Sequence, residues 1–181
     1  MDDSVDDAGL LARVAAGDKV AMRRLYDRYS GPLYHFIRAR LNDPFEAADV
    51  MQEAFLDLWR HAGRFEGRSS VRTWAFGIAR NKAADRLRRR ARVEIAEPDE
   101  TVPDDAPDPQ AVAEAASDAR RVRECIARLS PTHRSAIQLA FYRDLAYGEI
   151  AEIEGVPVGT IKTRIHYAKQ LLMRCLSAFR A

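Results

Sequence analysis

The feature that most limits how this chain can fold is an acidic, proline-rich segment at residues 93–110. Four prolines stand there among acidic residues, with little apolar material: Pro98, Pro103, Pro107 and Pro109. Prolines of this kind interrupt a helix, and a packed core needs more apolar surface. We therefore expect residues 93–118 to form a flexible acidic linker. It would separate one small domain at residues 1–92 from a second at residues 119–181.

The parts on either side of this linker show helical periodicity. No useful length of the chain alternates with period 2, and nearly every apolar pattern repeats at helical spacing. Asp18, Asp43 with Pro44, Ser69 or Ser70, and Ser130 with Pro131 are typical helix starts. Gly31 and Pro32 are expected to end one helix and begin the next. The predicted fold class is all-α, with helices near residues 6–16, 19–30, 32–42, 44–61, 70–90, 112–128, 131–143, 146–154 and 157–177.

Composition narrows the class of protein further. The 47% apolar content is ample for a core, and no apolar run approaches the roughly 20 residues of a membrane span. The acidic N-terminus, MDDSVDD, is unlike a signal peptide, so we expect a soluble, cytoplasmic chain without membrane insertion. Cys125 and Cys175 are interpreted as small buried hydrophobes, and a disulfide is not expected. The four scattered histidines predict no metal site, and no cofactor is expected.

The net charge of +2 conceals an uneven distribution. Residues 68–92 hold nine Arg or Lys and one acid, whereas residues 93–118 hold nine acids and no base. Residues 119–181 hold eleven bases and five acids. Two basic blocks around an acidic one indicate two surfaces that face polyanions.

The segment 44–61 carries an apolar seam and a neighbouring polar stripe. Met51, Ala54, Phe55 and Leu58 follow helical spacing and are predicted to face the core. The stripe beside them is Asp49, Gln52, Glu53, Leu56 and Arg60. Periodicity alone leaves a solvated face or a docking surface open for this stripe, with Leu56 favouring docking.

The next helix combines an apolar seam with a row of groups suited to nucleic acid. The seam is Val71, Trp74, Ala75 and Ile78. One stripe carries Trp74, Asn81, Asp85 and Arg88, and stacking plus amide hydrogen bonds is how proteins hold single-stranded bases. Core packing of Trp74 and simple solvation of the basic groups are the alternatives. The basic groups expected to face phosphates are Arg72, Arg80, Lys82, Arg86, Arg88, Arg89, Arg90 and Arg92.

Residues 146–177 have the pattern of a helix-turn-helix. Two apolar-seamed helices meet at Gly155, where a helix end favours a positive φ. Basic side chains on the second helix would hold phosphates or guanine edges, and threonines would reach phosphate or a thymine methyl. A generic helical hairpin is the alternative. The side chains expected on the exposed face are Thr160, Lys162, Thr163, Arg164, His166, Tyr167 and Lys169.

These motifs together resemble a known family. DVMQEAFLDLW and WAFGIARNKAAD closely resemble the second conserved domain of bacterial sigma factors, and IAEIEGVPVGTIKTRIHYAKQLL resembles the fourth. The two-domain length is similar to the extracytoplasmic-function class. The resemblance implies a non-enzymatic transcription initiation factor that binds core RNA polymerase and promoter DNA. It also implies a restraining anti-sigma protein as a further partner.

The resemblance implies roles for individual residues. Asp49, Gln52, Glu53 and Leu56 would dock on the clamp helices of the largest polymerase subunit. The melted −10 strand would be held by Phe65, Arg68, Ser69, Trp74, Arg80, Asn81, Asp85 and Arg88, with a pocket for a flipped base. The −35 duplex would be read by Thr160, Lys162, Thr163, Arg164, His166, Tyr167 and Lys169. Three residues depart from the family pattern: Ala146 replaces a Ser or Thr cap, Glu154 a leucine, and Tyr167 a frequent arginine.

Two other functions fit parts of the sequence. A free-standing helix-turn-helix regulator would bind an intact operator without polymerase, but it gives the 49–60 stripe no role. An enzyme acting on nucleic acid would need a phosphate loop, a metal cluster or a nucleophile set, and none of these motifs is found in the sequence.

Overall fold

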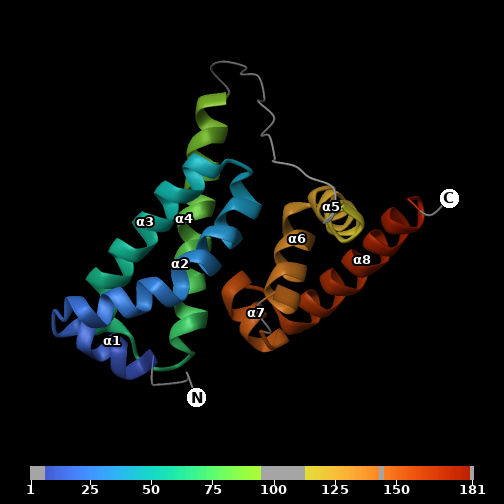
Figure 1. Cartoon of the computed structure of the whole chain (residues 1–181). Helices are drawn as coiled ribbons and strands as arrows, with labels where there is room; N and C mark the ends of the chain where they lie inside the picture. Colours follow the sequence, from blue (N-terminus) through green and yellow to red (C-terminus); the bar gives the residue numbers. More distant parts are fainter. Residues whose placement is uncertain (1–6, 95–112, 143–144, 180–181) are drawn as a thin grey trace.

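Helices make up all the regular structure in the part of the chain that the computed structural model describes, which is residues 7–94, 113–142 and 145–179. This confirms the all-α prediction. The first domain contains α1 (Asp7–Ala15), α2 (Lys19–Leu41), α3 (Pro44–His61), a short 3-10 turn (Ala62–Arg64) and α4 (Val71–Glu94). The second contains α5 (Ala113–Ala127), α6 (Pro131–Ile137), a π-helical turn (Gln138–Tyr142), α7 (Tyr147–Glu154) and α8 (Val158–Ser177) (Figure 1).

The predicted linker falls largely outside the described residues. α4 ends at Glu94 and α5 begins at Ala113, so helix covers both edges of the predicted 93–118 segment. Residues 95–112 and the acidic N-terminal tip lie outside the described ranges. The exact domain boundaries therefore remain a prediction.

Side-chain caps begin several helices where the sequence predicted them. Asp18 Oδ1 accepts a hydrogen bond from the Ala21 amide at 3.0 Å, and this bond lowers the pKa of the Asp18 carboxyl. Asp43, Ser70 and Ser130 accept backbone N–H bonds in the same way at the starts of α3, α4 and α6. The cap positions are thus confirmed.

The expected break at Pro32 is wrong. α2 continues through Gly31 and Pro32 as one helix of 23 residues. An interior proline costs about 3 kcal/mol. Buried Tyr29, Leu33 and Phe36 lie on both sides of it, and each such side chain gains about 1.5–3 kcal/mol on burial. Core packing therefore outweighs the local preference for a break.

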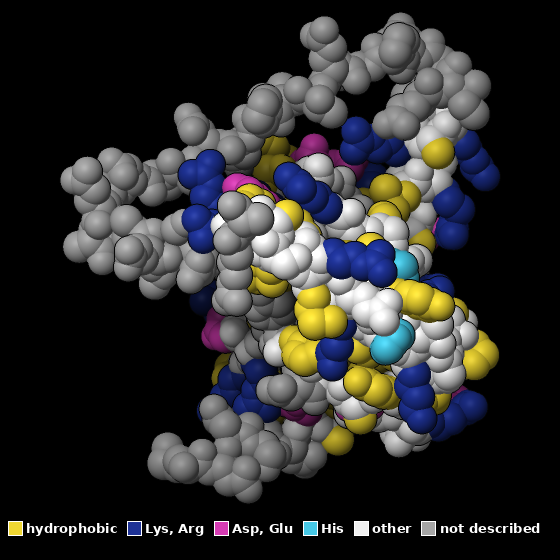
Figure 2. Space-filling model, turned by 90° about the vertical axis from the view of Figure 1, so that its right-hand side faces the viewer, with side chains coloured by type: hydrophobic (Ala, Val, Ile, Leu, Met, Phe, Trp, Pro, Cys, Tyr) yellow, Lys and Arg dark blue, Asp and Glu magenta, His cyan; other side chains and the backbone are white. Residues whose placement is uncertain are grey.

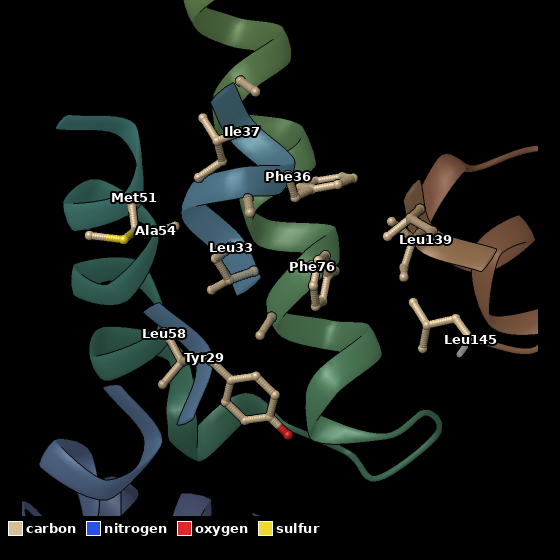
Figure 3. Packing of buried hydrophobic residues seen from close by; sticks show 14 of the residues in the cluster. Tyr29, Leu33, Phe36, Ile37, Met51, Ala54, Leu58, Phe76, Leu139 and Leu145 are labelled. Carbon is tan, nitrogen blue, oxygen red and sulfur yellow. The ribbon is translucent and has the colours of Figure 1, made fainter. Parts of the chain in front are cut away.

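The buried core runs from the first domain into the second. α2, α3 and α4 pack together, and the rings of Phe36 and Phe76 meet edge to face with centroids 5.1 Å apart. Figure 3 shows these two rings directed toward Leu139 and Leu145 of the second domain. All four side chains are nearly fully buried. The face of α4 that carries Phe76 is therefore covered by the second domain.

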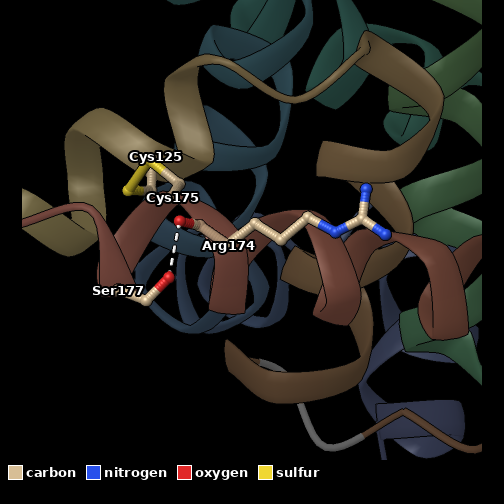
Figure 4. Close-up of a disulfide and its surroundings, with 4 residues drawn as sticks. All are labelled: Cys125, Arg174, Cys175 and Ser177. Carbon is tan, nitrogen blue, oxygen red and sulfur yellow. Dashed lines mark hydrogen bonds between the residues drawn. A yellow bond between two sulfur atoms is a disulfide. The ribbon is translucent and has the colours of Figure 1, made fainter.

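The cysteine prediction is correct for the burial of Cys125, but Cys175 is only half-buried and the two residues are bonded. Cys125 of α5 is buried as expected, but it forms a disulfide with Cys175 of α8, with a Cα–Cα distance of 5.8 Å. Figure 4 shows the bond between the two helices, close to the hydrogen bond from Ser177 to the Arg174 carbonyl. The two cysteines stand 50 positions apart in the chain, so no local pattern pairs them. Packing of α5 against α8 places them opposite each other.

Two structural absences hold within the described ranges. None of the helices there is long and apolar enough to cross a membrane. No group of three or more His, Cys, Asp or Glu side chains there is arranged to hold a metal ion.

Candidate functional site

An exposed stripe runs along the outer face of α3. Its members recur every three or four residues, so they share one side of the helix: Phe45, Asp49, Gln52, Leu56 and Arg60. Two are large apolar groups open to solvent, since Phe45 is 83% exposed and Leu56 is 55% exposed. The stripe confirms that Asp49, Gln52 and Leu56 are accessible. Sequence reasoning missed Phe45, although its position four residues before Asp49 gave the signal.

Glu53 lies on a different side of α3 and faces α4. Its Oε1 accepts a hydrogen bond from Arg86 Nη2 at 2.9 Å, and Arg86 Nη1 is 3.6 Å from Glu46 Oε1. Lys82 Nζ lies 2.7 Å from Asp57 Oδ2. Lys82 and Arg86, which were expected to face phosphates, are thus paired with acids of α3. Because these side chains are half-buried, the pairs brace the two helices against each other.

The outer half of α4 presents polar and basic groups. Asn81 is exposed, and its Oδ1 accepts a hydrogen bond from Arg80 Nη1 at 3.2 Å. Arg88 is exposed and pairs with Asp85 one turn away. The exposed amide and guanidinium are therefore available on the predicted stripe.

The loop before α4 contacts the first turn of that helix. The rings of Phe65 and Trp74 lie 5.3 Å apart between centroids, and both side chains are half-buried. Gly67 has φ +69°, which permits the turn between them. Arg68 is exposed beside Glu66. Phe65, Arg68 and Trp74 are thus brought close to one end of α4.

The helix-turn-helix forms as predicted. Gly155 has φ +63° and ends α7, and Ile161, Ile165 and Ala168 of α8 are buried. Five predicted DNA-contacting side chains of α8 are exposed: Lys162, Thr163, His166, Tyr167 and Lys169. Figure 2 shows Lys and Arg side chains spread over one face of the molecule, with hydrophobic and His side chains between them.

Several α8 side chains already have partners. Thr160 and Arg164 are half-buried, and Arg164 Nη1 is 3.9 Å from Glu154 Oε2. Lys169 Nζ lies 4.8 Å from the centroid of the exposed Phe141 ring. Lys162 forms no ion pair with another described side chain and is exposed to solvent, which suits a phosphate contact.

The cap of α7 compensates for the absence of a side-chain acceptor at Ala146. The Ala146 amide donates to Glu149 Oε2 at 3.0 Å, so a residue one turn into the helix satisfies the first donor. This departure from the family pattern therefore leaves the helix start intact.

Two segments of this chain match models of known protein families. Residues 25–93 match the family model for Sigma-70 region 2, and residues 119–172 match that for Sigma-70, region 4. The chain is 34% identical to the ECF RNA polymerase sigma factor SigL of Mycobacterium tuberculosis over 174 residues, which cover 90% of this chain and 94% of SigL. It is 32% identical to the ECF RNA polymerase sigma factor SigK of Mycobacterium bovis over 184 residues, covering 96% and 95%.

Solved structures share the fold. CnrH in complex with the cytosolic domain of CnrY has a TM-score of 0.69 and 26% identity, over 95% of this chain and 97% of CnrH. The sigma factor RpoE from Bartonella quintana, in complex with the anti-sigma factor NepR, has a TM-score of 0.73 and 24% identity, over 86% and 96%. The RpoE likeness supports the fold alone.

Proposed function

The chain belongs to the ECF class of RNA polymerase sigma factors, and we propose that it engages polymerase and promoter through three separate surfaces. It is a transcription initiation factor, so it binds core RNA polymerase and promoter DNA. Sigma factors are non-enzymatic initiation factors. We assign no catalytic step to this chain, and we place it in the cytoplasm with the polymerase.

The proposed polymerase-docking surface is the exposed α3 stripe. Asp49 and Gln52 supply polar contacts at its centre, and Leu56 supplies an apolar anchor that is otherwise exposed to water. Glu53 contributes by bracing α3 against α4 through Arg86, which keeps the stripe in place.

The proposed −10 surface is α4 with the loop before it. The exposed Asn81 amide suits base edges of a melted strand, and Arg88 suits its phosphates. Phe65 and Trp74 form an aromatic wall at one end, which suits stacking with an extruded base. The proposed −10 surface also includes Ser69, Arg80 and Asp85.

The proposed −35 surface is the exposed face of α8. A recognition helix enters the major groove with its N-terminal residues near base edges. Lys162, Thr163 and His166 lie in the first half of α8 and are exposed. Tyr167 and Lys169 follow on the same exposed side, and Thr160 and Arg164 flank it.

We also propose that an anti-sigma protein restrains this chain. CnrH, which is 26% identical and shares the fold, was solved in complex with the cytosolic domain of CnrY. The exposed apolar groups on α3 and α8, such as Leu56 and Leu171, would suit such a partner. Co-purification of the chain from its native cell would test this proposal, and recovery without any inhibitory partner would count against it.

The observation that carries the three-surface proposal is the presence of an exposed docking stripe and a basic recognition helix in one chain. A free-standing regulator has no use for the stripe and would form a stable complex with intact duplex on its own. Run-off transcription with core polymerase separates the two functions. We expect promoter-specific transcripts only when this chain is added. Operator binding without polymerase and no change in transcripts would overturn the proposal.

A further inference from the structure

A buried ion pair joins the two domains. Arg40 of α2 pairs with Glu154 at the end of α7, and their side chains are only 14% and 5% exposed. Ser135 of α6 donates from Oγ to Glu154 Oε1 at 2.6 Å, and Arg40 Nη2 lies 2.5 Å from the same Oγ. Burial lowers the pKa of Arg40, and the charge of Glu154 opposes that shift. Glu154 is the residue that stands where the family pattern has leucine.

Other polar contacts surround this pair and also cross between the domains. Arg80 Nη2 of α4 donates to the Glu154 carbonyl oxygen at 2.9 Å. Thr73 Oγ1 donates to Glu149 Oε1 at 3.1 Å, and Arg134 Nη1 donates to the Ala39 carbonyl oxygen at 3.1 Å. With the apolar contact around Phe76, they join α2 and α4 of the first domain to α6 and α7 of the second.

This interface competes with the proposed −10 function of α4. Arg80 is already bonded to the Glu154 carbonyl of α7, and the carboxylate of Glu149 lies against Thr73 in the first turn of α4. The −10 and −35 elements lie about 25 base pairs apart, which is about 85 Å along a duplex at 3.4 Å per step. One chain reads both only when its domains separate. The closed arrangement therefore excludes simultaneous contact with both elements.

We propose that Arg40 and Glu154 form a latch that holds the free protein closed until polymerase binding separates the domains. The closed state covers part of α4, so it withholds the −10 surface from nucleic acid. When the domains separate, the Arg40 side chain becomes exposed to water. Glu154 keeps its contacts with Ser135 and Arg164 of its own domain, so neither side chain is left as a buried charge without a partner. The link to promoter recognition rests on the proposed function, whereas the latch itself does not.

The Arg40–Glu154 pair can be tested with a single variant that breaks it and a double variant that should restore the closed arrangement. Glu154→Leu would leave the buried Arg40 guanidinium without its carboxylate, and Arg40 Nε already has no partner among the described residues. An uncompensated buried charge is strongly unfavourable, so this variant is expected to open. The double variant Arg40→Leu with Glu154→Leu replaces the pair by apolar groups, an exchange that is often neutral or stabilising. The double variant is therefore expected to keep the two domains in the closed arrangement.

Small-angle X-ray scattering of the full-length protein without polymerase measures the opening directly. We expect a larger radius of gyration for Glu154→Leu, and wild-type values for the double variant and for the control Glu152→Leu, which changes an exposed acid of the same helix. Circular dichroism checks that each variant is folded. If Glu154→Leu unfolds the second domain, Arg40→Gln breaks the pair from the first domain and should open the protein too.

Binding to core polymerase provides the second readout. A protein that is mostly closed binds with an affinity reduced by its open fraction. We expect Glu154→Leu to bind core polymerase about tenfold more tightly than wild type, with the double variant near wild type. Unchanged scattering for folded Glu154→Leu, or expansion of the double variant as well, would overturn the latch. Loss of polymerase binding in every variant, with scattering as expected, would instead count against the proposed function.

Discussion

Arg86 donates a hydrogen bond from Nη2 to Oε1 of Glu53 at 2.9 Å, and this contact ties α4 to α3. Two neighbouring acids of α3, Asp49 and Glu53, consequently have different surroundings. Asp49 is exposed on the stripe, whereas Glu53 is half-buried against a basic partner. The two carboxylates are therefore expected to contribute to different properties of the protein.

Asp49→Lys should weaken core polymerase binding by about tenfold, or about 1.4 kcal/mol, without changing the free energy of unfolding. Glu53→Ala should lower the free energy of unfolding by about 1 kcal/mol, because Arg86 loses a half-buried partner. Fluorescence titration with core polymerase and urea unfolding measure the two effects. Asp27→Lys on α2 is a charge-matched control at an exposed site. Wild-type polymerase binding by Asp49→Lys would contradict the docking assignment.

Asn81→Ala should reduce promoter opening about tenfold while leaving polymerase affinity unchanged. The amide is exposed on α4, and in the proposed −10 surface it would hydrogen-bond to bases that become available only when the strand is melted. Open-complex formation on a promoter fragment measures this effect, with a pre-melted −10 region as the matched substrate. A parallel loss of polymerase binding would indicate misfolding rather than a lost base contact.

Lys162→Ala should reduce the salt dependence of promoter binding by the polymerase complex. Removing one phosphate contact lowers the slope of log K against log salt by about 1. Anisotropy titrations between about 50 and 200 mM salt give this slope. Arg174→Ala removes an exposed basic side chain near the other end of α8. This variant should leave the slope of log K against log salt unchanged. Equal slopes for Lys162→Ala and wild type would place Lys162 away from DNA.

Reduction of the Cys125–Cys175 bond should lower the free energy of unfolding by about 4 kcal/mol, because the bond closes a loop of 50 residues in the unfolded chain. Urea unfolding with and without dithiothreitol measures the change. The variant Cys125→Ser with Cys175→Ser should show the lower value under both conditions. Identical unfolding curves for oxidised and reduced wild type would contradict this expectation.

Local signals predicted most of the helix starts. Asp18, Asp43 and Ser70 cap helices because their short polar side chains satisfy exposed amides within a few residues, and such contacts depend on nearby sequence alone. The buried face of α8 was predicted for a similar reason, since helical spacing fixes which side chains share a face. The break expected at Pro32 failed because buried neighbours on both sides hold the helix together.

Contacts between distant segments were beyond sequence reasoning. The charge count assigned Lys82 and Arg86 to phosphates, but the packing of α4 on α3 gives both of them acidic partners. Glu154 was recognised only as an unusual residue, and its partner Arg40 lies 114 positions earlier in the chain. The disulfide depends in the same way on the packing of α5 against α8.

Permanganate reactivity of unpaired thymines tests the central claim most directly, because it reports strand opening at defined promoter positions. Core polymerase, a promoter fragment and this chain are combined, and each is omitted in turn. We predict reactive thymines in and just downstream of the −10 element only when all three are present. Reactivity that is the same with and without this chain, at matched polymerase concentration, would contradict its role as the factor that directs and opens promoters.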